Sequence, residues 1–417
     1  MIGALGVGWK VWRAQWLSQP RLDALRSRLL TRTIAGAAAL PFYQDMWRGV
    51  DSATVTDPTK LVSLPTITKA DFRDRLDEIT APGFDENNTS VSYTSGSSGA
   101  TMRLLHDLDS KQYYNAAWIR AHMAYGVKPH HRTAYFRFEA VSPGVTAKLR
   151  VFRNEFVPFT TGDEMMAHLR RIRPHVLGGY PSYLAELITM VPAEDLRSLG
   201  VRWVYAGAET MPAQLKWQLE RIFDCPYVDM YGSTEFENMA FQCTHGTRHV
   251  SDDTMILEVV DDAGEPVGPG EVGDIVVTGL RNDAMPLIRY RIGDRGAWSD
   301  RPCECGRRFT VLPRLEGRTL EAVVTPSGRR YPVILLDEDL IHIETLFQFQ
   351  VVQETIDTLT LNIVCAPGTE EETRVKAQKA LVDVFEEPMN VTTKVVDSIP
   401  RSSGGKVKAI VPLPTRD

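Results

Sequence analysis

Strand-like and helix-like stretches alternate along residues 133–232, and this regular alternation restricts the chain to few architectures. Short apolar, β-prone stretches lie at residues 133–138 and 201–207, and amphipathic helical ones lie at residues 165–172 and 212–223. A strand followed by a helix and then by another strand is typical of a parallel sheet covered by helices. We therefore expect an α/β fold with a doubly wound, mainly parallel sheet.

The segments that flank this region show other patterns. The first 50 residues read as helical, because leucines recur there at helical spacing. Residues 255–312 contain short strands separated by turn-rich sequence, which predicts an antiparallel sheet or a small β-barrel. Residues 318–417 alternate on their own, as in a small α+β domain. We expect an N-terminal domain at 1–317 and a small, mobile C-terminal lid domain at 318–417.

Composition excludes several functional classes. The 417 residues carry 47 Lys and Arg against 53 Asp and Glu, a formal charge of −6, so the basic excess typical of nucleic-acid binding is missing. No apolar run reaches the ~18 residues of a membrane helix, which predicts no membrane partner. Five cysteines are few and odd in number, so no disulfide framework is expected. We expect a cytoplasmic protein.

A segment rich in glycine and hydroxyl groups, SYTSGSSGATMR at residues 92–103, follows a β-prone stretch. Backbone N–H groups and hydroxyls of such a loop can surround phosphate oxygens. It is not a Walker loop, because no Gly-Lys-Ser/Thr follows. Taken alone, it also reads as an ordinary polar loop. The candidate phosphate ligands are Thr94, Ser95, Gly96, Ser97, Ser98 and Gly99.

Four further segments pair glycine with polar groups, in the order GAET, YGSTE, RYRIGD and PRSSGGK. Together with the first loop, they resemble the motifs of the adenylate-forming superfamily of acyl-CoA synthetases, adenylation domains and luciferases. The resemblance covers residues 40–410 and is closest to the branch of phenylacetate–CoA ligases and coenzyme F390 synthetases. It implies that a carboxylate attacks the α-phosphate of ATP with Mg²⁺ present, giving an acyl-adenylate and pyrophosphate.

The resemblance also implies roles for single residues. Lys406 would bridge the carboxylate and the α-phosphate, Glu235 would bind Mg²⁺, and Thr234 would contact the α-phosphate. Without the motifs, Glu235 reads as a surface carboxylate, Asp294 as a turn residue and Lys406 as part of a basic tail. The residues that it assigns to the nucleotide are the 94–99 loop with Gly207, Ala208, Glu209, Tyr231 at the adenine, Gly232, Ser233, Asp294 at the ribose and Arg318.

Two positions depart from the family pattern. The lysine that usually follows the glycines of the phosphate loop is missing, and Arg103 could supply the positive charge instead. Leu320 stands where the family usually has an acidic hinge residue. A hinge needs only to absorb a dihedral change, so Leu320 leaves open whether the lid rotates in the usual way.

Cysteine and histidine spacing suggests a metal site. Cys243 and His249 form a Cys-x5-His pair, and Cys303 and Cys305 form a Cys-x-Cys pair. Three thiolates and one imidazole suit structural Zn²⁺ in a tetrahedral site. His245 competes with His249, but some members of the resembled branch bind zinc with a set like the one that contains His249. Four unrelated residues with buried free thiols are the alternative.

The resemblance places the acid pocket near Phe138, Glu139 and Tyr180. Aromatic side chains suit an aromatic or aryl-alkyl acid, although core aromatics would look the same. Glu139 would pair with an amino group on an amino-aryl acid.

We expect an AMP-forming acid–thiol ligase that passes the acyl group to coenzyme A, with a small carboxylic acid as partner and a homodimer as its assembly. The alternatives are transfer to an acyl carrier protein or an amine, nucleotidyl transfer to a hydroxyl as in F390 synthetase, and a non-catalytic nucleotide-binding protein.

Overall fold

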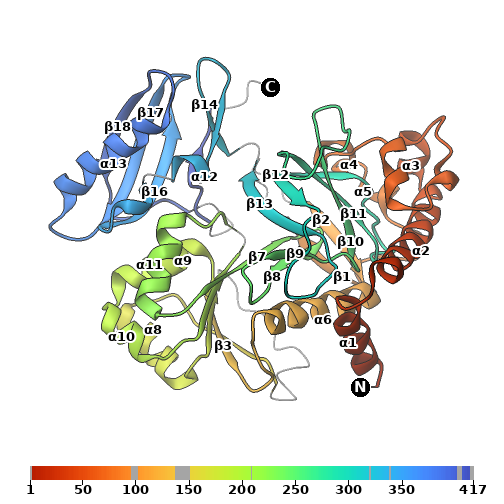
Figure 1. Cartoon of the computed structure of the whole chain (residues 1–417), viewed down its shortest axis with the longest axis horizontal. Coiled ribbons are helices and arrows are strands. Elements are labelled where there is room, and N and C mark those ends of the chain that lie inside the picture. The colour runs from red at the N-terminus through yellow and green to blue at the C-terminus, as the bar shows by residue number, and fades with distance from the viewer. Residues whose placement is uncertain are drawn as a thin grey trace. The chain divides into compact units, whose positions relative to one another are not determined.

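The computed structural model describes residues 2–94, 102–136, 151–207, 209–318, 321–337, 340–401 and 406–413, and the chain divides into two compact units (Figure 1). Unit 1 comprises Met1–Gly126 and Tyr231–Leu315, and unit 2 comprises Val127–Met230 and Glu316–Asp417. The expected domain boundary at residues 317 and 318 lies close to the end of the second unit 1 segment, and it stays a prediction. No helix of the described ranges is both long and apolar enough to cross a lipid bilayer.

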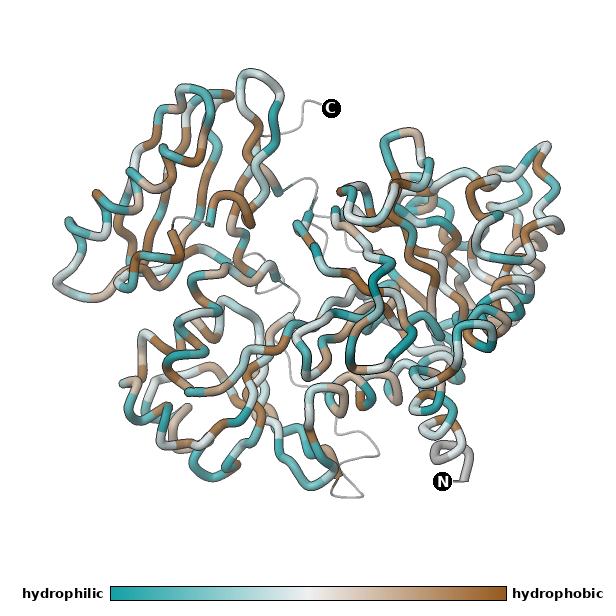
Figure 2. The backbone as a smooth tube through the Cα atoms, viewed as in Figure 1, coloured by the Kyte–Doolittle hydropathy of each residue, from teal (hydrophilic) through white to brown (hydrophobic). Residues whose placement is uncertain are grey.

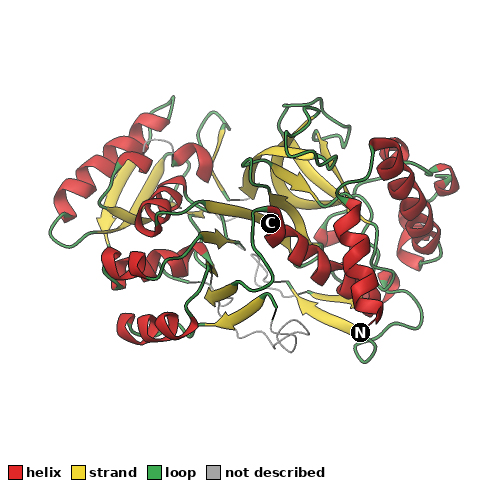
Figure 3. Cartoon of the chain, turned by 60° about the horizontal axis from the view of Figure 1, so that its bottom comes forward, coloured by secondary structure: helices red, strands yellow, loops and turns green. Residues whose placement is uncertain are grey.

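The first half of unit 2 is an α/β domain, as the alternation predicted. Its five strands pair in parallel in the order β4-β3-β5-β6-β7, and Figure 3 shows helices beside them. The predicted α/β fold with a mainly parallel sheet is therefore confirmed. The elements are β3 (Arg132–Phe136), β4 (Arg153–Phe156), α8 (Gly162–Ile172), β5 (Val176–Gly179), α9 (Pro181–Met190), α10 (Ala193–Ser198), β6 (Trp203–Ala206), α11 (Ala213–Phe223) and β7 (Tyr227–Ser233).

A glycine in β5 lets two aromatic rings meet across the sheet. Gly178 pairs with Tyr135 of β3 on one side and with Tyr205 of β6 on the other. The two rings stack with their centroids 5.7 Å apart. A Cβ atom at Gly178 would lie 2.3 Å from the Tyr205 ring, so any larger residue would displace this pair.

The second half of unit 2 is a small α+β domain, again as expected. Its sheet has the order β18-β17-β16-β19, with an antiparallel centre and parallel outer pairs. Figure 2 shows hydrophobic stretches along these strands. Its elements are β14 (Ala322–Val324), β15 (Arg330–Pro332), α12 (Val333–Leu336), β16 (Leu346–Gln353), β17 (Thr358–Cys365), α13 (Glu370–Val384), β18 (Asn390–Val395) and β19 (Ile410–Val411).

Unit 1 begins with helices, as its leucine spacing predicted, and continues with an antiparallel sheet. Pro20 and Pro41 stand in the first turns of α2 and α3, where proline is favoured because no N–H bond is lost. The helices are α1 (Ile2–Ala14), α2 (Gln19–Ala38), α3 (Pro41–Met46), α4 (Lys69–Phe72), α5 (Leu76–Ile79) and α6 (Leu108–Ala124). The strands are β1 (Thr89–Tyr93), β2 (Arg103–Asp107), β8 (Glu237–Gln242), β9 (Arg248–Val250), β10 (Met255–Val260), β11 (Gly273–Gly279), β12 (Tyr290–Ser299) and β13 (Val311–Arg318).

The expected small barrel near residues 255–312 is an open sheet instead. The strands follow one another in the order β10-β11-β12-β13-β9-β8. Among the described strands, no pairing returns from β10 to β13, so the sheet does not close. The antiparallel-sheet alternative is therefore confirmed and the barrel was wrong. The sequence could not separate them, because alternation along each strand is the same in both architectures and closure depends on pairing between distant strands.

Candidate active site and metal centre

The YGSTE motif forms a tight turn between β7 and β8 in unit 1. A Cβ atom on Gly232 would lie 2.3 Å from the carbonyl oxygen of Glu237, and Glu237 itself has a left-handed φ of +57°. The turn is therefore specific for glycine at residue 232. His106 of β2 reinforces it, because ring atom Nε2 lies 3.2 Å from the carbonyl oxygen of Thr234. Burial lowers the pKa of His106, so at neutral pH the uncharged ring donates this bond.

Two predicted nucleotide-binding residues contact each other beside this turn. The Tyr231 hydroxyl donates to Asp294 Oδ2 at 2.7 Å, and both side chains are buried. The Tyr290 hydroxyl lies 3.3 Å from Glu235 Oε1 and donates to it. Each of the two carboxylates, predicted to bind ribose and Mg²⁺, is thus oriented by a tyrosine.

The phosphate loop is described only at its first residue, since Ser95, Gly96, Ser97, Ser98 and Gly99 lie outside the described residues. Thr94 is buried, and its Oγ1 accepts from the Lys69 ammonium at 3.0 Å and from the Met102 N–H at 3.1 Å. Arg103 is paired with Glu86 at 2.7 Å. Within the described ranges, Lys69 of α4 thus contacts the first residue of this predicted loop, whereas Arg103 pairs with Glu86.

A second group of predicted residues lies in unit 2, around Glu209. Its carboxylate accepts from the backbone N–H and hydroxyl of Ser182 at 2.9 and 3.0 Å, and from the Val407 N–H at 2.9 Å. Burial raises the pKa of Glu209, although these three hydrogen bonds oppose the shift. The carboxylate thus joins the first turn of α9 to the residue after Lys406.

The remaining predicted residues are placed less fully. Gly207 follows β6, and its N–H donates to the Gly179 carbonyl at 3.3 Å. Arg318 is the last residue of β13, and Tyr180 is the buried residue that precedes α9. Ala208, Phe138, Glu139 and Leu320 lie outside the described residues.

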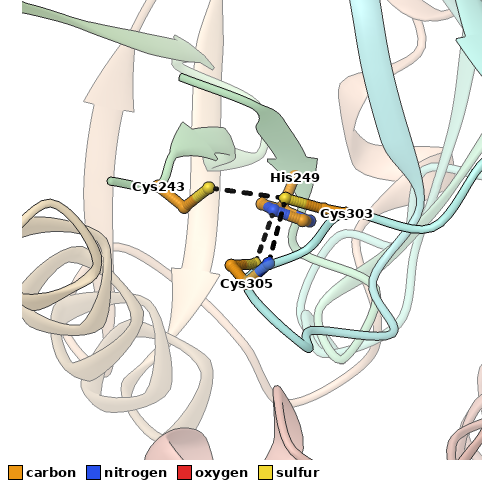
Figure 4. A group of neighbouring side chains, drawn as sticks. All are labelled: Cys243, His249, Cys303 and Cys305. Atoms are coloured by element: carbon orange, nitrogen blue, oxygen red, sulfur yellow. Dashed lines mark hydrogen bonds between the residues drawn. The ribbon is translucent and has the colours of Figure 1, made fainter. Parts of the chain in front are cut away.

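The four predicted zinc ligands meet in unit 1 (Figure 4). Cys243 Sγ lies 3.7 Å from Cys303 Sγ, and Cys305 Sγ lies 3.3 Å from His249 Nε2. In a tetrahedral zinc site, ligand bonds of about 2.0 to 2.3 Å place two sulfurs about 3.8 Å apart, and a sulfur and a nitrogen about 3.5 Å apart. The separations therefore fit a metal ion at the centre.

The ionisation of this cluster also suits a metal. Burial lowers the pKa of His249 to about 4, so the ring is neutral at pH 7 and can act as a ligand. Its Nδ1 lies 3.5 Å from the Phe309 carbonyl oxygen, which leaves Nε2 directed at Cys305. Burial raises the pKa of Cys243 to about 11, which disfavours the thiolate. A bound cation would stabilise the thiolate and oppose this effect. The competing ligand His245 is half exposed and faces Glu304 instead.

The comparisons with known proteins agree with the motifs. Residues 50–282 match the AMP-binding enzyme model, and residues 324–412 match the CapK C-terminal domain model. The chain is 25% identical to a phenylacetate-coenzyme A ligase of Thermus thermophilus, over 95% of this chain and 98% of that one. It is 24% identical to a phenylacetate-coenzyme A ligase of Escherichia coli, over 93% of this chain and 94% of that one.

Among solved structures, 2-hydroxyisobutyryl-CoA ligase in its postadenylation state is similar in fold. Its TM-score is 0.81 at 19% identity, covering 96% of this chain and 91% of that one. The relatives are therefore matched along nearly their whole length.

Proposed function

Because the chain belongs to the AMP-binding enzyme family, we propose that it is an AMP-forming acid–coenzyme A ligase. In the first step, a carboxylate oxygen attacks the α-phosphorus of ATP and pyrophosphate leaves. In the second, the thiol of coenzyme A attacks the acyl carbon and AMP leaves. The observation that carries the proposal is the near full-length similarity to a phenylacetate-coenzyme A ligase, which spans both matched family regions.

Residues of this chain supply distinct parts of the first step. Asp294, oriented by Tyr231, would accept hydrogen bonds from the ribose hydroxyls. Glu235 would hold Mg²⁺, which neutralises phosphate charge when bound. Lys406 would stabilise the charge that develops between the carboxylate and the α-phosphate.

The acid is proposed to be aromatic or aryl-alkyl. The stacked pair Tyr135 and Tyr205 stands toward the carboxyl ends of parallel strands, where ligands bind in open α/β sheets. The rings of Tyr180 and Phe159 lie 5.8 and 4.8 Å from Tyr183, which adds apolar surface in the same unit. The relatives named for phenylacetate favour this class as well.

A structural Zn²⁺ at Cys243, His249, Cys303 and Cys305 is part of the same proposal, supported by ligand spacing and by the neutral imidazole. Transfer to a carrier protein or an amine, a homodimer and a cytoplasmic location stay predictions.

Pyrophosphate release tests the proposed reaction. Purified protein is given ATP and Mg²⁺ with phenylacetate, 4-hydroxybenzoate, anthranilate or 2-hydroxyisobutyrate, with and without coenzyme A. We expect release that depends on an aromatic acid and a coenzyme A thioester as product. Lys406→Ala should lower the rate at least about 100-fold, the usual scale for one group that stabilises transition-state charge.

Lys408→Ala, which removes a nearby lysine, serves as the control and should keep most of the rate. Acid-dependent release without any thioester would instead favour a carrier-protein or amine acceptor. No release with any acid would contradict the proposal.

A further inference from the structure

Arg401 joins the C-terminal part of unit 2 to helix α9 through three kinds of contact. One guanidinium nitrogen donates to the Ser182 hydroxyl at 2.9 Å, and the other is paired with Glu186. The guanidinium also lies over the Tyr183 ring, 3.9 Å from its centroid. The side chains of Arg401 and Glu186 are only 22% and 20% exposed, so solvent screens this ion pair less than it screens a surface pair.

The contacts require the shape of arginine. A planar guanidinium can stack on an aromatic ring while its edge donates to two different acceptors, and a lysine ammonium cannot do both. The Tyr183 ring is also one of the aromatic rings proposed above to add apolar surface for the acid. Tyr183 therefore serves the Arg401 contact on at least one face.

Arg401 stands at one end of the segment that carries Lys406, and the other end is held as well. Arg401 and Val407 form an antiparallel bridge, so the two ends lie side by side. The Val407 N–H donates to Glu209, whose carboxylate also accepts from Ser182. Ser182 thus contacts Arg401 at one end of the segment and Glu209, which holds Val407 at the other end.

We infer that Arg401, with Glu186 as its ion-pair partner, is a positioning residue that fixes the Lys406 segment on α9 for acyl-adenylate formation. This inference rests on the proposed function. A lysine on a loop loses catalytic value when the loop samples many positions, because the charge must already be in place when the transition state forms. The second step attacks the acyl carbon and does not use the charge of Lys406 on the α-phosphate. Arg401 should therefore matter for the first step only.

Amide hydrogen exchange tests the holding contacts without any substrate. We expect Arg401→Ala to raise exchange of peptides covering residues 400–413 at least about 10-fold, the scale of one lost charge-assisted hydrogen bond. Arg170→Ala, which breaks an exposed pair with Asp195 in the same unit, should leave those peptides unchanged. Unchanged exchange in Arg401→Ala would overturn the inference, whatever the activity of the protein.

The two half-reactions test the catalytic consequence. The first is measured as pyrophosphate release with the best acid of the panel above, and the second as thioester formation from the synthetic adenylate of that acid and coenzyme A. Arg401→Ala should lower kcat of the first step about 10-fold or more, with the second step and the KM for ATP little changed. Arg401→Lys should restore little of the loss, and Glu186→Gln should reproduce part of it.

Equal losses in both half-reactions would show a general structural role and overturn the inference. A parent protein that is inactive with every acid would instead contradict the proposed function, while hydrogen exchange would still decide whether Arg401 holds the segment.

Discussion

At the scale of single residues, a lysine from a distant part of the chain contacts Thr94, the first residue of the predicted phosphate loop. The Lys69 ammonium lies 3.0 Å from Thr94 Oγ1, and Lys69 is 25 residues away in sequence. Arg103, which is nearer to Thr94 in sequence, forms ion pairs with Glu86 and Asp77 instead. A cation at Thr94 stands beside the loop proposed to hold the β- and γ-phosphates, where it would offset their charge.

We predict that Lys69→Ala raises the KM for ATP about 10-fold, with the KM for the acid unchanged, because one charged contact to phosphate is lost. Steady-state pyrophosphate release at varied ATP measures this. Arg103→Ala is the matched control and should change the KM for ATP less than about 3-fold. If Arg103→Ala has the larger effect, Lys69 merely holds Thr94 in place.

The sequence predicted the residues that lie within motifs and missed those that reach a motif from elsewhere. Tyr231, Glu235 and Asp294 are predicted site residues because each sits in a short pattern of glycine and polar residues. His106 bonds to Thr234 across 128 positions, and Arg401 bonds to Ser182 across 219. No spacing rule connects such pairs, because only the folded chain brings them together.

At the scale of elements, local signals set some helix boundaries. The helix expected at residues 165–172 begins earlier, at Gly162, because the Thr161 side chain accepts from the Glu164 N–H and caps the first turn. It ends where Arg173 adopts a left-handed conformation. Arginine does not favour that conformation, so the sequence did not predict this end of the helix. Boundaries fixed by capping could thus be predicted in part, whereas the order of the strands in each sheet could not.

The proposed zinc site also belongs to this scale, because it would link the turn after β8 to a loop that precedes β13. We predict that the purified protein holds about one zinc ion per chain and that Cys303→Ser loses it, since three ligands cannot close a structural site. The zinc released when the purified protein is unfolded gives the metal content. Both this metal content and the melting temperature should be lower in the Cys303→Ser variant. Cys365→Ser, in β17 outside the cluster, should keep the metal.

The site would be contradicted if the parent protein held no zinc after expression in zinc-containing medium and after refolding in the presence of zinc. The cluster would then be three free thiols beside an unrelated histidine, with no metal to join them.

At the scale of the whole molecule, the sequence did not predict which segments of the chain form each compact unit. Residues 127–230 and the C-terminal segment form one compact unit, although unit 1 separates them along the chain. The contacts that join them are specific. Gln214 of α11 donates to the Ile343 carbonyl at 3.2 Å, and Gln218 donates to the Leu346 carbonyl at 2.9 Å. Side-chain amides on a helix carry no sign of such distant partners.

Asp337 adds a buried carboxylate to the same junction, and it makes the stability of unit 2 depend on pH. Its side chain accepts from the Ala213 N–H at the first turn of α11. Burial raises the pKa of Asp337 from 3.8 to about 6, against the opposing effect of the Ala213 and Gln214 N–H groups. The folded state therefore binds more protons than the unfolded state between these values, so this group lowers stability as pH rises from about 4 to 6.

We predict that Asp337→Asn, which keeps an oxygen acceptor without the charge, is more stabilising at pH 7.5 than at pH 4.5 by about 2 kcal/mol. The free energy of unfolding in urea, measured for parent and variant at both pH values, gives this difference. Asp195→Asn, which removes a half-exposed carboxylate from the same unit, is the control for the loss of a surface charge. If Asp337→Asn shifts stability equally at both pH values, the carboxylate is ionised in the folded protein throughout. The favourable effect of the helix N-terminus on the charge would then offset the effect of its burial.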